Sequence, residues 1–183
     1  MEHLTTADLE EGIDHIRRAP GDHGRVELIV RRPAVDGREV LGEATLDLVE
    51  GLVGDTWRVR GSSRTADGSS HPDMQLNLMN ARTAALVAGH PDRWQLAGDQ
   101  LYVDLDLSEA NLPPGTRLEL GSAVIEITAQ PHLGCKKFSA RFGNDALRFV
   151  NSPIGRELRL RGANAKVVVP GCVRVGDVIR KLL

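Results

Sequence analysis

Residues 101–107, LYVDLDL, carry the clearest strand pattern in the sequence. Apolar and polar side chains alternate at every position, so alternate side chains would lie on opposite faces of a strand. The apolar set is Leu101, Val103, Leu105 and Leu107, and the other set is Tyr102, Asp104 and Asp106. The segment therefore predicts a strand with one face directed towards a core.

Short segments with a similar pattern lie on both sides of it. They are residues 25–31, 44–49, 74–79, 117–120 (RLEL), 123–129 (AVIEITA), 165–169 (AKVVV) and 173–182 (VRVGDVIRKL). In the first of these we expect Val26, Leu28 and Val30 to share a face. Around both Gly121 and Gly176 the pattern reads as a strand, a glycine turn and a second strand. Many short strands at regular spacing favour a barrel over a layered α/β fold.

Helical patterns are few and lie outside these segments. Residues 5–18 have apolar side chains at helical spacing, Asn80 is placed to cap a short helix that Gly89 stops, and Pro153 occupies a tolerated first-turn position. We therefore expect a mainly β protein with a few peripheral helices. The chain divides into a helical extension at residues 1–24 and a barrel domain at residues 25–183.

Composition excludes several classes of function. The 183 residues suit one domain, and a net charge of −2 argues against nucleic-acid binding as the main role. No segment is long and apolar enough to span a membrane, and the N-terminus lacks a signal-peptide core, so we expect a cytoplasmic protein. Nothing suggests that Cys135 and Cys172 meet an oxidising compartment.

Cys135 is the residue best placed for chemistry. It lies in QPHLGCKKFSARFG, after a strand and beside His132, Lys136 and Lys137. A thiolate is the reactive and metal-binding form of cysteine, and neighbouring positive charge favours it. A buried structural cysteine is an equally good interpretation of these residues alone. Use of His132 as its base in a hydrolase would need a third group and an oxyanion hole, which the sequence does not reveal.

Several arginines and hydroxyls are candidates for binding an anion. The polar segment at residues 58–65, RVRGSSRT, offers a phosphate Arg60, Ser62, Ser63 and Arg64, although a mobile solvated loop is the better interpretation of these residues taken alone. Arg141 and Arg161 are further candidates, and each is also a good surface arginine.

Five segments in a fixed order together resemble the MOSC domain, named after the C-terminal part of molybdenum cofactor sulfurase. They are GLVGD (51–55), AGDQL (97–101), PPG with LELGSAVIEIT (113–128), GCKKF (134–138) and RGANAKVVVPGCVRVGDVI (161–179). The resemblance covers about residues 25–183. Around the cysteine the family usually reads Pro-Cys-x-Lys, and here Gly134 replaces the proline while Lys137 fills the lysine position. Asp99 and Gln100 replace the usual acid and amide. The family's Arg-Gly-x-Tyr appears here as Arg161-Gly162-Ala163-Asn164, without the aromatic ring.

The resemblance implies a β-barrel of the pyruvate-kinase barrel type and a molybdenum cofactor (molybdopterin). Cys135 would be the catalytic residue and the metal ligand, and Gln100 would contact the pterin edge. The chain contains neither a desulfurase domain nor a flavin or iron–sulfur domain, so a partner protein is implied.

Three functions follow in order of preference. The first is a molybdenum-dependent oxidoreductase that reduces small N-hydroxylated substrates with an electron-donor protein. The second is a sulfur carrier, or sulfur transferase, that receives a persulfide on Cys135 from a cysteine desulfurase. The third is a non-catalytic module that binds small molecules.

Overall fold

Seven strands close into a barrel in the computed structural model, which describes residues 3–182. Their order around the barrel is β11, β7, β8, β9, β5, β6 and β1, and β1 pairs with β11 to complete the circle. The strands are β1 (Gly24–Arg31), β5 (Leu76–Asn80), β6 (Leu101–Asp104), β7 (Arg117–Leu120), β8 (Ala123–Ile127), β9 (Ala163–Val169) and β11 (Val178–Lys181). The expected mainly β barrel is therefore confirmed, while its assignment to the pyruvate-kinase type stays a prediction.

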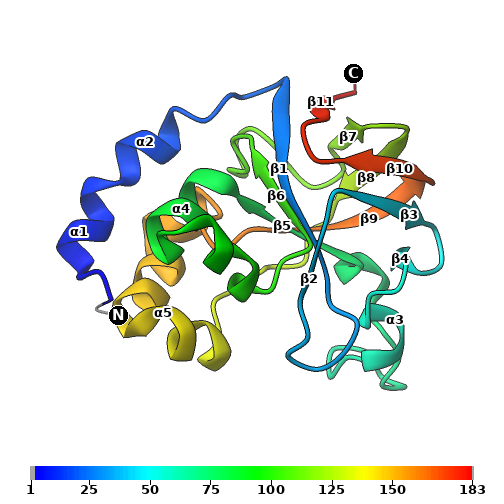
Figure 1. The fold of residues 1–183 in the computed structure, drawn as a ribbon, viewed down its shortest axis with the longest axis horizontal. Coiled ribbons are helices and arrows are strands. Elements are labelled where there is room, and N and C mark those ends of the chain that lie inside the picture. Colours follow the sequence, from blue (N-terminus) through cyan, green and yellow to red (C-terminus); the bar gives the residue numbers. More distant parts are fainter. Residues whose placement is uncertain (1–2, 183) are drawn as a thin grey trace.

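Other strands extend the barrel on one side. β2 (Glu39–Leu41) pairs with β1 outside the closed circle. A separate three-stranded sheet has the order β10 (Gly171–Arg174), β3 (Glu43–Asp47), β4 (Gly51–Leu52). Figure 1 shows this sheet beside the barrel, on the side away from most of the helices.

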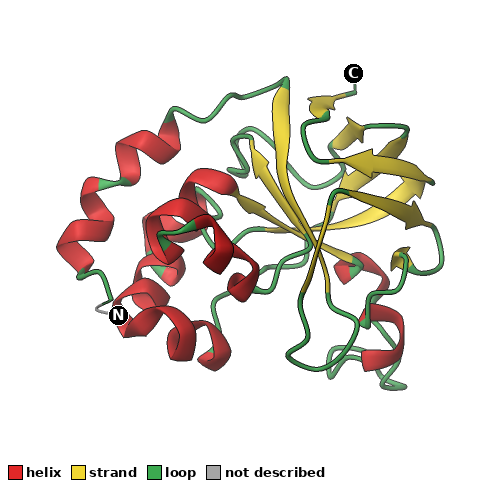
Figure 2. Ribbon diagram, viewed as in Figure 1, coloured by secondary structure: helices red, strands yellow, loops and turns green. Residues whose placement is uncertain are grey.

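Most helices gather against the opposite side of the barrel (Figure 2). The α-helices are α1 (Thr6–Glu11), α2 (Ile13–Arg17), α3 (Trp57–Arg60), α4 (Ala81–Ala88), α5 (Lys136–Asn151) and α6 (Pro153–Glu157). Two 3-10 helices, η1 (Pro72–Met74) and η2 (Pro91–Ala97), accompany them. The predicted N-terminal helix is present as α1 and α2, but the division of the chain at residue 24 stays a prediction.

The buried apolar residues form two clusters that share the barrel wall. Ile29, Leu101, Val103 and Ile179 belong to the cluster inside the barrel. Leu9, Val30, Tyr102, Phe138 and Phe149 belong to the cluster between the barrel and the helices. Leu101 and Val103 face inwards as predicted, and the intervening Tyr102 is equally buried because helices cover the outer face of β6.

The predicted face of β1 is wrong beyond Val26. The pairing of β1 with β6 shifts register between Val26 and Leu28, as at a β-bulge. An extra residue reverses the alternation of side chains. Ile29 therefore joins Val26 inside the barrel, while Leu28 and Val30 pack under the helices.

The connection from β5 to β6 sets the position of the candidate site. These two strands are parallel, and a parallel pair needs a crossover, which α4 and η2 supply. The predicted cap and stop of α4 are confirmed, since the Asn80 side chain accepts hydrogen bonds from the backbone N–H groups of Arg82 and Thr83, and Gly89 ends the helix. η2 then ends at the barrel wall, just before β6.

Two further features differ from the sequence analysis. The two strands predicted around Gly176 are present as β10 and β11, but they do not pair with each other, because β10 pairs with β3 whereas β11 pairs with β7 and β1. The pair around Gly121 is confirmed as the β7–β8 hairpin. α5 is a helix that the sequence analysis did not predict, and a non-helical Gly143 (φ 91°) interrupts it.

Candidate functional site

The C-terminal end of η2 lies at the centre of an arginine cluster. Four successive carbonyl groups accept hydrogen bonds from four different arginines. The pairs are Gln95 with Arg38 (3.2 Å), Leu96 with Arg141 (2.7 Å), Ala97 with Arg161 (2.9 Å) and Gly98 with Arg32 (3.0 Å). Carbonyls at a helix end lack partners within the helix and carry partial negative charge, which suits cations. We call Arg32, Arg38, Arg141 and Arg161 the arginine cluster.

Gly98 has the backbone conformation that this arrangement requires. Its φ of 94° lies in the left-handed region, which favours glycine at the end of a helix. A Cβ atom here would lie 3.4 Å from Nη2 of Arg38 and 3.8 Å from Nη1 of Arg141. Both guanidinium groups therefore lie against the same glycine, one from the β1–β2 connection and one from α5.

Arg32 is held by a buried ion pair. Its Nε and Nη2 atoms donate to both carboxylate oxygens of Asp55 at 2.8 Å, and the Asp55 side chain is fully buried. Nη1 also donates to the side-chain oxygen of Asn77 at 3.0 Å. A bidentate pair with this many contacts fixes the guanidinium rigidly, so Arg32 supports the cluster structurally.

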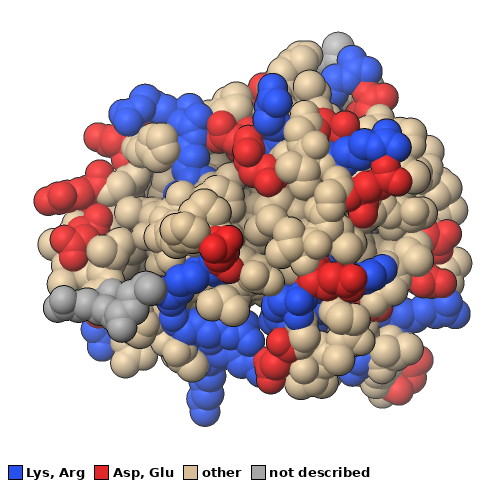
Figure 3. All heavy atoms as spheres, viewed as in Figure 1, with Lys and Arg blue, Asp and Glu red and all other residues tan. Residues whose placement is uncertain are grey.

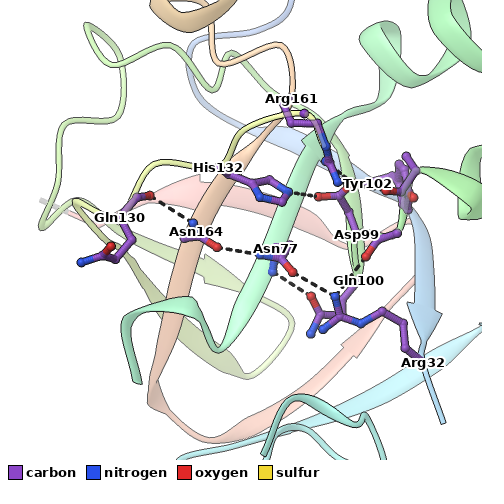
Figure 4. Close-up of polar contacts among 12 residues, drawn as sticks. Arg32, Asn77, Asp99, Gln100, Tyr102, Gln130, His132, Arg161 and Asn164 are labelled. Carbon is purple, nitrogen blue, oxygen red and sulfur yellow. Dashed lines mark hydrogen bonds and ion pairs between the residues drawn. The ribbon is translucent and has the colours of Figure 1, made fainter. Parts of the chain in front are cut away.

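Asp99 lies between His132 and Arg161 (Figure 4). Its carboxylate oxygens lie 2.7 Å from Nε2 of His132 and 2.6 Å from Nη1 of Arg161. Burial raises the pKa of Asp99, but the charges and hydrogen bonds of its two partners outweigh burial and bring it to about 2. The pKa of His132 is lowered by burial and by Arg161, against the opposing effect of Asp99. At neutral pH the imidazole is therefore uncharged, and Arg161 holds Asp99 ionised.

The predicted contact residue Gln100 is engaged within the protein. Its side-chain oxygen accepts from the backbone N–H of Asn77 at 2.8 Å, and its amide nitrogen donates to the carbonyl of Gln75 at 3.2 Å. Asn77 continues this network to Asn164, which donates to the carbonyl of Gln130 (Figure 4). In this structure the Gln100 amide joins β5 to β6 and offers no free edge to a ligand.

Arg161 is also sequestered, and one of its atoms has no partner. Its side chain is 7% exposed, and its guanidinium lies 5.1 Å from the centre of the Phe138 ring. Nε of Arg161 has no hydrogen-bond partner among the described residues. The structure therefore places Arg161 behind the candidate site, in contact with Asp99.

Cys135 lies at the start of α5 and is exposed. Its carbonyl accepts from the backbone N–H groups of Phe138 and Ser139, so its position follows from the first turn of the helix. Lys137 and Arg141 on the same helix both reach Oδ1 of Asp36 at 3.1 Å. These contacts join the first turns of α5 to the β1–β2 connection, which also supplies Arg38. Lys and Arg side chains gather over this region on the lower part of the face in Figure 3.

The predicted anion-binding loop follows α3. Arg64 reaches the Gln130 side chain at 3.4 Å, next to the segment that carries His132 and Cys135. The Ser62 hydroxyl accepts from the backbone N–H of Arg64, and Ser63 is exposed. Arg60 is exposed, and the pKa of its guanidinium is lowered by loss of hydration and then by the charge of Arg32.

The sequence analysis missed Arg32 and Arg38. The segment 31–38, RRPAVDGR, is rich in arginine beside a strand, and that composition is the signal that could have found them. Loss of hydration and the charges of Arg141 and Arg32 lower the pKa of Arg38, although it stays protonated at neutral pH.

A cavity of about 400 Å³ opens next to His132. It lies among the segment 128–133, α6 and the start of β9, and its polar lining includes Arg156, Arg159 and Glu109. None of the arginine cluster lines it. The site therefore has two parts, the arginine cluster with Cys135 and the cavity, with the His132–Asp99–Arg161 contact between them.

Together, these features define a small β-barrel protein in which an exposed thiol accompanies a cluster of arginines. The MOSC domain model matches residues 70–180, more than half of the chain. The chain belongs to the MOSC domain family. No helix within residues 3–182 is long and apolar enough to cross a membrane.

Solved structures share the fold at low sequence identity. The YuaD protein from Bacillus subtilis is 17% identical, with a TM-score of 0.63 over 85% of this chain and 93% of that one. YiiM from Escherichia coli is 21% identical, with a TM-score of 0.56 over 87% and 70%. YiiM from Geobacillus stearothermophilus is 12% identical, with a TM-score of 0.54 over 88% and 73%. A search of curated protein sequences found no match.

Proposed function

We propose that the chain binds a molybdenum cofactor, with Sγ of Cys135 as the protein ligand of the metal. Membership of the MOSC family motivates the proposal, because the family is associated with this cofactor. The observation that carries it is the exposed Cys135 thiol on a helix whose Lys137 and Arg141 contact the β1–β2 connection. Arg141 lies six residues after Cys135, which is about 9 Å along a helix.

The residues present fit such a group by their charge and their donor type. Arg38 and Arg60 make no ion pair with any carboxylate of residues 3–182. Both guanidiniums lose hydration in the structure, and each is close enough to other arginines for their charges to lower its pKa. The two guanidiniums without a carboxylate partner, Arg38 and Arg60, would attract a phosphate-bearing ligand. A thiolate is a soft ligand suited to molybdenum.

Each group then has a role in holding the cofactor. Arg38 and Arg60 would pair with its phosphate, and Arg32 would keep Arg38 in place through their shared contact with the end of η2. The cofactor, when bound, would supply the redox chemistry at its metal. For the whole protein we propose reduction of small N-hydroxylated substrates in the cytoplasm, with electrons from a separate donor protein.

Metal analysis tests this proposal directly. The full chain is purified from a host that makes the cofactor, and molybdenum and pterin are measured per chain. We expect near-stoichiometric molybdenum in wild type, a loss of at least tenfold in Cys135→Ala, and full retention in the matched control Cys172→Ala. Absence of molybdenum from wild type, or its full retention in Cys135→Ala with an unchanged circular dichroism spectrum, would contradict the proposal.

A second candidate, the sulfur carrier, is favoured by the exposure of Cys135. In that reaction the Cys135 thiolate attacks the terminal sulfur of a persulfide on a cysteine desulfurase. A new S–S bond forms on Cys135, and the desulfurase cysteine leaves as a thiolate. Cyanide-releasable sulfur on wild type and Cys172→Ala, but not on Cys135→Ala, would support this function, and none on wild type would exclude it.

A further inference from the structure

The cavity beside His132 has a charge pattern of its own. Its lining carries two guanidiniums, Arg156 and Arg159, against the single carboxylate of Glu109. Burial lowers the pKa of Arg159, and the opposite charge of Glu109 raises it. Nε of Arg156 donates to the carbonyl of Asn151, and Arg156 makes no ion pair within residues 3–182. Arg156 is therefore the cation that a ligand in the cavity would meet.

His132 presents a bare nitrogen atom. Asp99 is ionised at neutral pH, so it accepts the hydrogen bond and Nε2 of His132 must carry the proton. In the neutral imidazole the other nitrogen, Nδ1, is then an acceptor. Nδ1 has no hydrogen-bond partner among residues 3–182. It is also not one of the side-chain atoms that are both buried and without a partner. It therefore reaches open space, and His132 lines this cavity.

The backbone at Arg159 has an unusual conformation that places this arginine at the cavity wall. Its φ of 47° is left-handed, and it follows α6 at a position where glycine is usually found. The two hydrogen bonds of this helix end, from Leu160 to Gly155 and from Arg159 to Arg156, are both present. An arginine here costs about 1 kcal/mol in backbone energy compared with glycine. Nη1 of Arg159 donates to the carbonyl of Leu112 at 2.7 Å, which holds the guanidinium at the wall.

We propose that this cavity binds a small organic acid that also carries an O–H or N–H donor. Its carboxylate pairs with Arg156, and its donor binds Nδ1 of His132. The volume of about 400 Å³ suits a small molecule, and the walls between the two polar groups include apolar side chains such as Leu133 and Val150. The inference does not rest on the proposed cofactor, because the cavity lining shares no residue with Cys135 or the arginine cluster.

Titration calorimetry with matched probes tests both contacts. The probes are the three hydroxybenzoate isomers, benzoate, which lacks the hydroxyl, and the hydroxybenzamides, which lack the charge. For wild type at pH 7.5 we expect at least one hydroxybenzoate isomer to bind. Benzoate and the matching amide should each bind roughly tenfold more weakly, because each loses one hydrogen-bonded or charged contact.

Variants assign each contact to its residue. His132→Leu removes Nδ1 and leaves no other acceptor, while Asp99 keeps its pair with Arg161, so this variant should bind the hydroxybenzoate and benzoate equally. Arg156→Ala should bind the hydroxybenzoate and its amide equally. Arg148→Ala, an exposed arginine outside this cavity, is the matched control and should behave as wild type.

Three results would overturn the inference. The first is that no hydroxybenzoate isomer binds wild type at about 10 mM, a concentration at which weak specific ligands bind. The second is that benzoate and the hydroxybenzoate bind wild type equally. The third is that Arg156→Ala binds the hydroxybenzoate as wild type does. Cys135→Ala should bind the probes as wild type does. Loss of molybdenum and loss of probe binding are therefore distinguishable outcomes.

Discussion

At the scale of single residues, Asp99 is the most consequential charge in the protein. It is buried between His132 and Arg161, and its low pKa means that it stays ionised throughout the neutral range. Arg161 has no other carboxylate partner among residues 3–182. The Asp99 carboxylate therefore has two effects. It neutralises the buried charge of Arg161, which stabilises the fold, and it orients the imidazole of His132.

We expect Asp99→Asn to lower the free energy of unfolding by about 3–5 kcal/mol, because it leaves the buried Arg161 charge unpaired. Urea denaturation followed by circular dichroism measures the change. Asp145→Asn is the matched control, since Asp145 pairs with the exposed Arg148, and it should cost less than about 1 kcal/mol. Equal effects of the two substitutions would show that the Asp99 pair is not the buried contact described.

The sequence predicted some site residues and not others, for a reason visible at this scale. Cys135, Lys137 and Arg141 lie close together in one segment, where local composition is informative. Arg38 lies outside that segment, and its contact with Gln95, which is 57 residues away, is not visible in the local sequence. Gln100 illustrates the reverse case, because its binding partners are backbone groups that no composition reveals.

At the scale of elements, the end of η2 converts four scattered arginines into one cluster. The arginines come from the β1–β2 connection, α5 and the segment before β9. The carbonyl of Gln95 also accepts from the backbone N–H of Gly98, but the other three carbonyl groups depend on the arginines for their hydrogen bonds. The cluster thus depends on one 3-10 helix, because its terminal carbonyl groups need more than one arginine as hydrogen-bond donors.

Two arginines of the cluster should respond differently to removal. Arg32→Ala leaves the buried Asp55 unpaired and should cost about 3–5 kcal/mol of unfolding free energy. Arg38→Ala loses its hydrogen bonds to the carbonyls of Gln95 and Gly37 and should cost about 1–2 kcal/mol, but it should lower cofactor content severalfold because Arg38 has no carboxylate partner and can pair with a phosphate. Urea denaturation and pterin analysis of both variants check this. Full pterin content in Arg38→Ala would remove that arginine from the proposed phosphate site.

Helices and strands were predicted correctly where the sequence signals agreed, and were missed where one signal interrupted another. α4 has a cap, an apolar face and a glycine stop in agreement. α5 buries Phe138, Phe142 and Phe149, but Gly143 between them breaks the helical geometry and obscures the period. In β1 the bulge after Val26 cannot be inferred from alternation, because a bulge is set by pairing with β6.

At the scale of the whole molecule, the barrel depends on the seam between β1 and β11. Gly24 pairs with Ile179, and Arg25 with Val178. Ile179 is fully buried in the barrel interior, whereas its neighbour Val178 is 50% exposed. The sequence indicated a barrel from strand spacing, but it contained no sign of which two strands close it.

Ile179→Ala should lower the free energy of unfolding by about 2–5 kcal/mol, because it leaves a cavity in the interior at the seam. Val178→Ala removes a half-exposed side chain from the same strand and should cost less than about 1 kcal/mol. Hydrogen exchange should also show faster opening of β1 and β11 in Ile179→Ala. Similar costs for the two substitutions would mean that the seam is not part of the packed interior.

The seam has a consequence for how the protein is made. β11 is synthesised about 150 residues after β1, its partner in the circle. During translation the edge of β1 that pairs with β11 stays unpaired while the intervening strands emerge from the ribosome. Unpaired strand edges in growing chains can pair with other chains and aggregate. Among the described residues β11 is the last strand in chain order, and its pairing with β1 completes the barrel. The emergence of β11, more than the folding of any earlier element, should set the moment at which this edge of β1 is covered.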